Sequence, residues 1–194
     1  MRFIKKFVIL LFLAIVVSSV LLYFLYDNYQ VRRDDAILRT QKDIQDQYAN
    51  LIDAQRNIAE IFYQEAIRES SVISYLYQAN QGDGLAKNQA RQSMARQLQS
   101  LFKSLQSRNF NYLNFYLNNG ETFLRLQQPE KYGDDLTGKS YSIRVVNERR
   151  RYLEGFELSQ DYNGYRYIFP LFDGSYYLGS VEFGISLQNF KNQL

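Results

Sequence analysis

An unbroken apolar run lies near the start of the chain, between Phe7 and Tyr26. Its twenty positions carry no charged side chain. Helical residues rise about 1.5 Å each, so twenty of them cross the roughly 30 Å hydrocarbon core of a bilayer. A cleaved signal peptide has a shorter apolar core, of about 7–15 residues, that ends at small residues. The run therefore predicts a transmembrane helix over residues 7–26.

After this run the pattern changes to a helical repeat without glycine or proline. Apolar residues recur seven positions apart, at Ile37, Ile44, Leu51 and Ile58, which is the spacing of a coiled coil. The pattern predicts one long helix from Asp27 to Ala79. Two interpretations of its apolar stripe stay open: it pairs with a second copy in a parallel homodimer, or the rest of the chain covers it.

A second helix and a hairpin follow. Residues 80–84 (NQGDG) are typical of a turn, and the apolar positions of Leu85–Ser107 keep the helical period. The period then becomes two in Phe110–Asn118 and Glu121–Gln127, which Asn119-Gly120 separates. Asn-Gly favours a tight hairpin, because both turn positions need positive φ.

Pairing across this turn places Asn114 opposite Arg125 and Tyr116 opposite Phe123. One face of the hairpin then carries leucine and phenylalanine and is predicted to be core. The other face combines aromatic rings with polar groups. A solvent face is usually richer in Thr, Lys and Glu, so this face is predicted to line a covered ligand pocket, with an exposed amphipathic surface as the alternative. The predicted pocket face carries Tyr112, Asn114, Tyr116, Phe123, Arg125 and Gln127.

The rest of the chain predicts a loop, a short helix and three more strands. Residues 128–140 form the loop and Tyr141–Arg151 the helix. The strands are expected at Tyr152–Gln160, Gly164–Phe172 and Ser175–Ser186. The sequence therefore predicts an α+β protein with an N-terminal transmembrane helix, a long membrane-proximal helix, a second helix and a five-stranded antiparallel sheet.

Composition removes most enzyme classes. The chain contains neither cysteine nor histidine. It therefore has no disulfide, thiolate nucleophile, Ser-His-Asp triad or histidine-ligated zinc. Because no nucleophile with a base partner is found, we expect a binding protein without a cofactor or metal rather than an enzyme.

The net charge of +3 comes from the N-terminus. Three of the 23 basic residues are Arg2, Lys5 and Lys6, so the other 20 balance the 20 acidic residues. A nucleic-acid-binding domain would carry its positive charge on the folded part, so we expect no nucleic-acid partner. The positive-inside rule places the basic N-terminus in the cytoplasm and residues after about 27 outside.

One charged residue lies on the predicted pocket face. The guanidinium of Arg125 is able to bind a carboxylate through two parallel hydrogen bonds. It is equally able to pair internally with Asp134 or Asp135 in the following loop. The first interpretation predicts an anionic ligand, and the second predicts a structural ion pair.

Other candidates lie in the loop and in the later strands. Lys131 and Tyr132 belong to the loop expected to close the pocket. Glu157 and Arg166 face each other across the third and fourth predicted strands, where a plain cross-strand ion pair is the favoured interpretation. The predicted ligand-binding residues are Asn114, Tyr116, Phe123, Arg125, Lys131, Tyr132, Glu157, Arg166 and Tyr167.

Three segments resemble a known family. They are LNFYLNNGETFLRLQQPEKYGDDL (residues 113–136), EGFELSQDYNGYRYIFPLF (154–172) and LGSVEFGI (178–185). They are similar to the extracytoplasmic Cache domains, of double-Cache and PAS-like type, of bacterial sensor kinases, diguanylate cyclases and chemoreceptors. The expected division is a cytoplasmic N-terminus (1–6), a transmembrane helix (7–26), a helical stalk and second helix (27–109), a PAS-like sensory domain (110–187) and an exit segment (188–194).

The residues and the resemblance together predict a function. We expect a single-pass protein of the bacterial inner membrane whose periplasmic part binds a small polar or anionic molecule, such as a carboxylate. Ligand binding would change helix packing and signal to an output module outside this chain, from within a homodimer. The alternative is an anchored periplasmic protein that pairs through its long helix and binds no small molecule.

Overall fold

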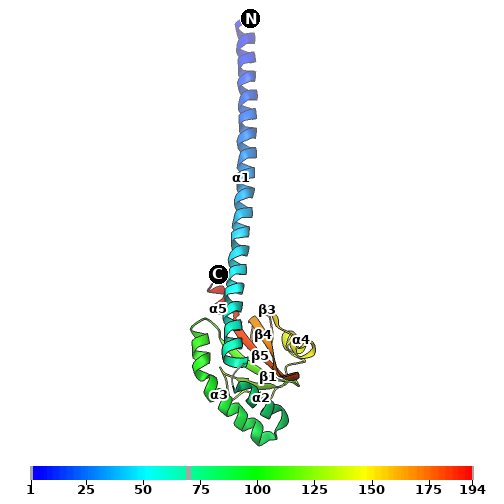
Figure 1. Cartoon of the computed structure of the whole chain (residues 1–194). Helices are drawn as coiled ribbons and strands as arrows, with labels where there is room; N and C mark the ends of the chain where they lie inside the picture. Colours follow the sequence, from blue (N-terminus) through cyan, green and yellow to red (C-terminus); the bar gives the residue numbers. More distant parts are fainter. Residues whose placement is uncertain (1, 69–70, 194) are drawn as a thin grey trace. The chain divides into compact units, whose positions relative to one another are not determined.

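The computed structural model describes residues 2–68 and 71–193 and divides the chain into two compact units, one up to Asn50 and one from Leu51. Helix α1 (Arg2–Phe62) forms the first unit and continues into the second (Figure 1). In the described part of the chain, its N-terminal portion is the one helix long and apolar enough to cross a membrane. That portion includes the predicted span.

The heptad stripe of α1 is covered over only part of its length. Ile37 and Ile44 are 57% and 59% exposed. Leu51 and Ile58 instead pack against the hydrophobic core of the second unit. The rest of the chain therefore covers the C-terminal part of the stripe. Pairing with a second copy stays a prediction for Ile37 and Ile44.

The predicted single helix from Asp27 to Ala79 is wrong at one point. The α-helix gives way at Tyr63–Arg68 (η1) to a π-helical turn. There the ring of Tyr63 stacks on Phe169 at 4.5 Å, and its hydroxyl donates to the carbonyl of Pro170 at 2.9 Å. These two contacts hold Tyr63 against the sheet at the point where the α-helix changes to a π-helical turn. A local helical period does not reveal such distant partners.

Helices α2 (Val72–Gln81) and α3 (Gly84–Gln106) follow and pack against each other. The turn predicted between them is confirmed, and the side chain of Asp83 caps α3 by accepting from the backbone N–H of Ala86 at 2.9 Å. The buried face of α3 confirms the helical period read from the sequence. It includes Ala90, Arg91, Met94, Leu98, Phe102 and Leu105.

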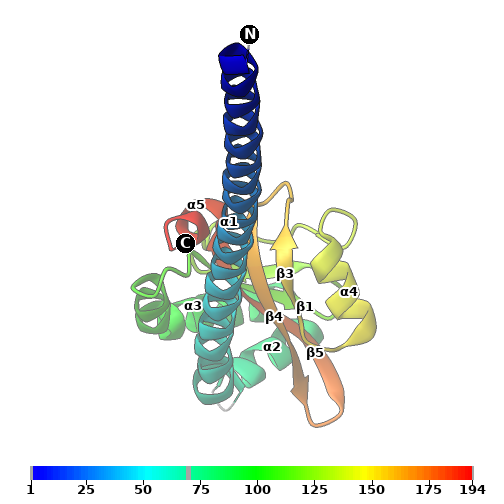
Figure 2. The same ribbon diagram turned by 90° about the horizontal axis from the view of Figure 1, so that it is seen from above.

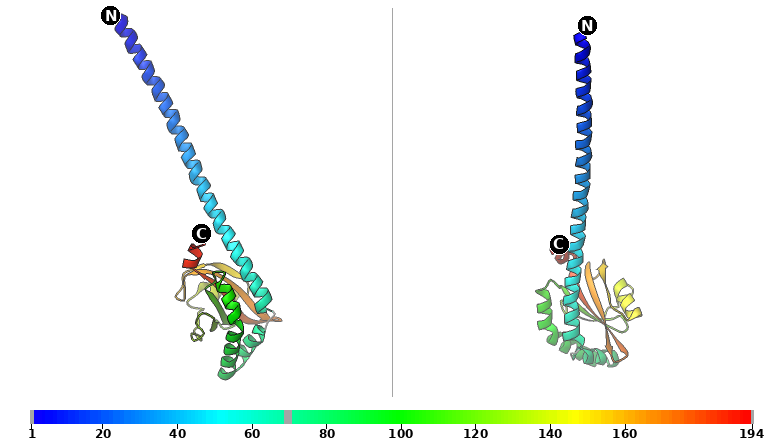
Figure 3. Two further views of the ribbon diagram at one scale, coloured as in Figure 1. Left: turned by 90° about the vertical axis from the view of Figure 1, so that its left-hand side faces the viewer. Right: turned by 45° about the horizontal axis from the view of Figure 1, so that its top comes forward.

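Five antiparallel strands form one sheet in the order β2-β1-β5-β4-β3. Helix α4 covers one face, and α2, α3 and the C-terminal part of α1 cover the other (Figures 2 and 3). The α+β class and the five-stranded antiparallel sheet are as predicted. The elements are β1 (Tyr112–Leu117), β2 (Thr122–Arg125), α4 (Tyr141–Arg149), β3 (Leu153–Glu157), β4 (Gly164–Asp173), β5 (Tyr176–Ser186) and α5 (Leu187–Lys191).

The β1–β2 hairpin carries an irregularity that changes which side chains share a face. Asn114 lies opposite Arg125 as predicted, but Tyr116 lies opposite Thr122 instead of Phe123. On the side of β2 away from β1, the backbone N–H of Thr122 donates to the carbonyl of Asp134 at 2.9 Å. A one-residue shift moves a side chain to the opposite face of a sheet, so Phe123 lies in the helix-covered core.

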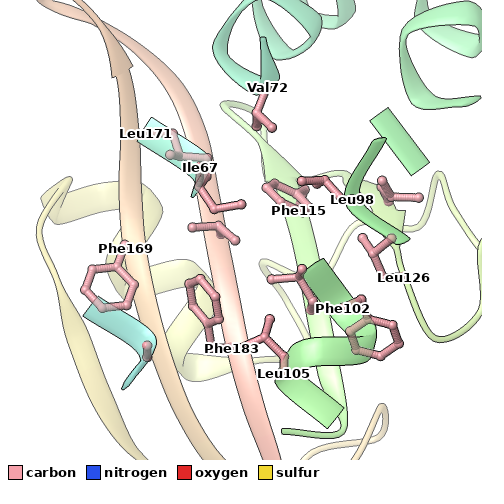
Figure 4. Packing of buried hydrophobic residues seen from close by; sticks show 14 of the residues in the cluster. Ile67, Val72, Leu98, Phe102, Leu105, Phe115, Leu126, Phe169, Leu171 and Phe183 are labelled. Carbon is pink, nitrogen blue, oxygen red and sulfur yellow. The ribbon is translucent and has the colours of Figure 1, made fainter. Parts of the chain in front are cut away.

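Two hydrophobic clusters hold the second unit together. The larger one joins the helices to one face of the sheet, with Phe115 on β1 and Phe183 on β5 near its centre (Figure 4). All five positions predicted as hairpin core belong to it: Leu113, Phe115, Leu117, Leu124 and Leu126. The smaller cluster lies under α4 and contains Tyr116, Leu136, Ile143, Val146, Ile168 and, partly buried, Leu153.

Candidate functional site

The sheet face under α4 carries a buried polar cluster centred on Glu182 of β5. Asn114 on β1 and Ile168 on β4 are the direct cross-strand neighbours of Glu182. Side chains two residues apart on a strand share a face, so Tyr116 and Arg166 also point to this side. The register of three adjacent strands therefore brings these groups together.

The carboxylate of Glu182 is fully buried and accepts four hydrogen bonds. The Nδ2 of Asn114 donates to Oε1 at 3.2 Å and the hydroxyl of Tyr162 at 2.5 Å. The hydroxyl of Tyr116 and Nη1 of Arg166 each donate to Oε2 at 3.0 Å. These five residues are called the Glu182 cluster below. A buried charge needs this kind of pairing, because an isolated carboxylate is costly to remove from water.

Burial and the charge of Glu182 also shift the pKa values of the neighbouring side chains. Burial, reinforced by Glu182, raises the pKa of Tyr116 and of Tyr162 well above the ordinary value of 10. Both hydroxyls therefore stay protonated and keep donating. Burial opposes the charge of Arg166, but attraction to Glu182 and its other partners outweighs burial and raises its pKa. Arg166 is therefore permanently charged.

Arg166 is 1% exposed and has a second set of partners. Its Nη2 donates to Oγ of Ser159 at 2.6 Å and to the carbonyl of Tyr162 at 3.1 Å. Its Nε lies 3.8 Å from Oε2 of Glu157 and is a buried donor without a hydrogen-bond partner in the described part of the chain. Glu157 and Arg166 do not face each other as expected, because Arg166 lies opposite Gly155 and Glu157 opposite Gly164. They still form a diagonal ion pair, but Glu182 is the closer partner of Arg166.

Arg125 forms the internal pair that the sequence left as one of two interpretations. Its Nη1 and Nη2 each donate to one oxygen of Asp134 at 2.8 Å. Nη1 also donates to the carbonyl of Lys131 at 3.0 Å, and Nη2 lies 3.5 Å from Asp161. Asp135 instead bonds Thr137. Arg125 thus ties the 128–140 loop to β2, and it no longer requires an anionic ligand.

A pocket of about 120 Å³ lies between α4 and the sheet. Of the predicted ligand-binding residues, only Glu157 and Arg166 line it. Glu157 also accepts from the first backbone N–H groups of α4, from Tyr141 at 3.0 Å and from Ser142 at 3.2 Å. The pocket is lined by Tyr141, Ser142, Leu153, Glu154, Gly155, Phe156, Glu157, Arg166 and Ile168.

Several predicted site residues lie elsewhere. Tyr167 points into the helix-covered core, where its hydroxyl donates to the carbonyl of Ile52 at 3.1 Å. Phe123 lies on the same side because of the hairpin irregularity. The Tyr132 ring stacks over the guanidinium of Arg91 at 3.4 Å, and the Lys131 side chain is exposed. None of these four side chains lines the pocket.

Glu182, the centre of the cluster, is not among the predicted ligand-binding residues. Glu182 is the single charged residue in the run LGSVEFGI of a buried strand. A lone acid in such a run is a usable signal, since a buried carboxylate needs partners on neighbouring strands. The contribution of α4 to the pocket had no comparable signal. In residues 2–68 and 71–193, no three His, Cys, Asp or Glu side chains gather as metal ligands would.

The pocket wall β3 is also bonded to α1. Nε of Arg56 on α1 donates to Oε2 of Glu154 on β3 at 2.6 Å, and its Nη2 bonds the other oxygen. Asp53 pairs with the same guanidinium. Near the C-terminal end, Nε2 of Gln55 donates to Oε1 of Gln193 at 2.6 Å. Within the second unit, α1 thus contacts both the pocket strand and the C-terminal segment.

Comparison with known proteins gives a family match over most of the chain. Residues 37–194 match the family described as the double sensory domain of two-component sensor kinases. No curated protein matches the chain.

Solved structures of sensory domains are also similar. An extracellular ligand-binding receptor from Desulfohalobium retbaense is 14% identical, with a TM-score of 0.47, over 76% of this chain and 26% of its own. The ligand-binding domain of the Campylobacter jejuni chemoreceptor Tlp3, in complex with 4-methylisoleucine, is 13% identical with a TM-score of 0.42, over 77% and 62%. The ligand-binding domain of Mlp24 with asparagine is 12% identical with a TM-score of 0.34, over 72% and 63%. The chain thus spans less than two thirds of each of these structures.

Proposed function

The chain belongs to the family of double sensory domains of two-component sensor kinases, and from this we propose that it is a membrane-anchored sensor. It binds a small molecule in the pocket between α4 and the sheet and transmits the event through α1. The family is described as sensory, not as catalytic. One observation carries the proposal: β3 lines the pocket and is ion-paired to α1.

The pocket and α1 are joined directly through the single strand β3. All five residues of β3 line the pocket, and the carboxylate of one of them, Glu154, also bonds Arg56 on α1. β3 is an edge strand, bonded only to β4, so a displacement meets less resistance than in the middle of the sheet. A ligand that moves β3 moves its charged partner on α1. Differential contacts of this kind let a ligand shift a conformational equilibrium.

We place the basic N-terminus in the cytoplasm and the second unit outside the inner membrane, following the apolar span and its positive flank. The signal then travels along α1 to an output module outside this chain. The contact of Gln55 with Gln193 gives the C-terminal segment a second connection to the same helix. Two copies pair through Ile37 and Ile44.

Filling the pocket should abolish ligand binding without unfolding the domain. A thermal-shift screen of small metabolites, including amino acids, is run on the full chain in lipid nanodiscs, and every stabilising compound is retested on Leu153→Phe. Leu153 is only partly buried, so the larger ring enters the pocket without overpacking the core. We expect a tenfold or greater loss of affinity, on the order of 1.4 kcal/mol or more.

Leu158→Phe is the matched control, because Leu158 is 71% exposed just beyond β3. It should leave affinity unchanged. The proposal fails if no compound stabilises the chain, or if Leu153→Phe binds each stabilising compound as tightly as Leu158→Phe does.

The exposed part of the stripe predicts a parallel dimer. The chain has no native cysteine, so a single introduced cysteine reports one position without background. Scanning residues 37–48 in membranes, we expect disulfide crosslinks with a period of about 3.5 residues and maxima at Ile37 and Ile44. Crosslinks without that period, or none, would indicate a monomer.

The second candidate function is an anchored protein that pairs through α1 and binds no small molecule. The exposed apolar side chains of Ile37 and Ile44 favour it, because they need a partner helix whether or not the pocket is used. Periodic crosslinks together with an empty metabolite screen would select this alternative.

A further inference from the structure

The polar end of the pocket is occupied by the chain's own carboxylate. Glu157 accepts from the backbone N–H groups of Tyr141 and Ser142 at the start of α4. These groups have no partner inside the helix and carry the positive end of its dipole. Glu157 is the last residue of edge strand β3, and its side chain is 13% exposed. It therefore reaches solvent by rotation of its side chain, without disturbing the sheet.

A second feature of this end of the pocket is a hydrogen-bond donor of Arg166 that lacks an acceptor. Nε of Arg166 is buried and donates to no described acceptor. Its distance of 3.8 Å from Glu157 is too long for a hydrogen bond. Glu182 saturates the opposite edge of the guanidinium through Nη1. A buried N–H without an acceptor is unfavourable, and an anion placed closer than Glu157 would remove that penalty.

The other end of the pocket is apolar. Leu153 and Ile168 supply its walls. Its volume is about 120 Å³ with Glu157 in place, and cavities near 150 Å³ hold benzene, so it accommodates about five non-hydrogen atoms before Glu157 moves out. A suitable ligand is short, with one anionic end and one hydrocarbon end.

We propose that the pocket binds a short-chain monocarboxylate whose carboxylate displaces Glu157 from α4 and accepts a hydrogen bond from Nε of Arg166. This inference rests on the function proposed above and names the ligand class of the same pocket. The Glu157 side chain then acts as an internal competitor that holds the site when the ligand is absent.

The charges around the site favour an anion over an amine. Glu182 and Arg166 already neutralise each other, and Glu154 is held by Arg56. When Glu157 moves into water, the incoming carboxylate replaces its charge, so the balance beside Arg166 and the α4 N-terminus is restored. An ammonium group would instead lie next to two positive groups and leave the Nε donor unsatisfied.

The test uses the full chain in nanodiscs and three four-carbon probes of similar size: sodium butyrate, butyramide and butylammonium chloride at constant ionic strength. We expect only butyrate to raise the melting temperature. In Glu157→Gln, calorimetry should give a butyrate Kd about tenfold lower than in the native chain, because a competitor that holds the site nine-tenths of the time weakens apparent affinity by that factor. If this variant does not fold, Glu157→Ala, which also lacks the carboxylate, serves instead.

Leu153→Phe should lose butyrate binding in both backgrounds. The inference is overturned if butyramide or butylammonium stabilises the chain as well as butyrate does, or if removing the Glu157 carboxylate does not tighten butyrate binding. If butyrate fails while another compound binds and is lost in Leu153→Phe, this ligand class is wrong and the proposed sensory function stands. If no compound binds, both fail.

Discussion

Glu182→Gln is expected to lower the free energy of unfolding by about 3–5 kcal/mol, the usual loss when one partner of a buried ion pair is removed. The amide keeps the shape of the side chain but leaves Arg166 charged, 1% exposed and without its closest counterion. It also replaces one of the two carboxylate oxygens, which together accept from four donors, with an NH₂ group that cannot accept. Guanidinium unfolding followed by tyrosine fluorescence measures the loss, since the chain has 17 tyrosines and no tryptophan.

Glu121→Gln provides the matched control. Glu121 pairs with Lys87 at 2.6 Å, with about a fifth of each side chain exposed, so water replaces the lost partner. Its cost should be about 1 kcal/mol or less. The double variant Arg166→Met/Glu182→Leu should cost less than the two single changes together, because no uncompensated charge remains. Equal losses in Glu182→Gln and Glu121→Gln would contradict the assigned role of Glu182.

Arg125→Ala is expected to lower the free energy of unfolding by about 2 kcal/mol and to leave ligand affinity unchanged. The substitution breaks two hydrogen bonds to Asp134 and one to the carbonyl of Lys131, but Asp134 is 38% exposed and recovers water. Lys131→Ala is the control, because only the backbone of Lys131 contacts Arg125. Lost affinity at unchanged stability would return Arg125 to the ligand site.

The effect of Arg125→Ala should depend on pH. The hydrogen bonds from Arg125 hold the pKa of the Asp134 carboxyl below its ordinary value of 3.8. A depressed folded-state pKa stabilises the protein above the unfolded value, and this stability is lost as pH falls through the folded value. The stability curves of the native chain and the variant should therefore stay apart at neutral pH and converge below about pH 3.8. Parallel curves down to pH 2 would show that Asp134 is not the partner.

Local patterns predicted most of the elements. The change of period after α3, the Asn119-Gly120 turn and the alternation in the later strands gave five antiparallel strands with one helix inserted. These signals depend on residues within a few positions of one another. The end of α1 was missed because the stacking of Tyr63 on Phe169 joins residues more than a hundred positions apart.

The site was predicted less completely for the same reason. Asn114, Tyr116 and Arg125 share one sheet face, as the alternation in the hairpin indicated, and Arg166 lies on the same face. Phe123 moved to the other face through a single irregularity between Phe115 and Tyr116. Alternation assigns faces only while the register is regular, and here the bulge changed the face of Phe123 while Leu124 and Arg125 kept the faces predicted for them.

The sequence by itself determined the apolar span, the helical stripe, the class of fold and the absence of histidine and cysteine chemistry. The tertiary structure decided which charges are paired. Arg125 is paired with Asp134, and Arg166 lies closer to Glu182 than to Glu157. Composition and period record what each residue is able to do, but the energy of a buried charge depends on distances of a few ångströms to groups on other strands. Only the assembled sheet and α4 set those distances.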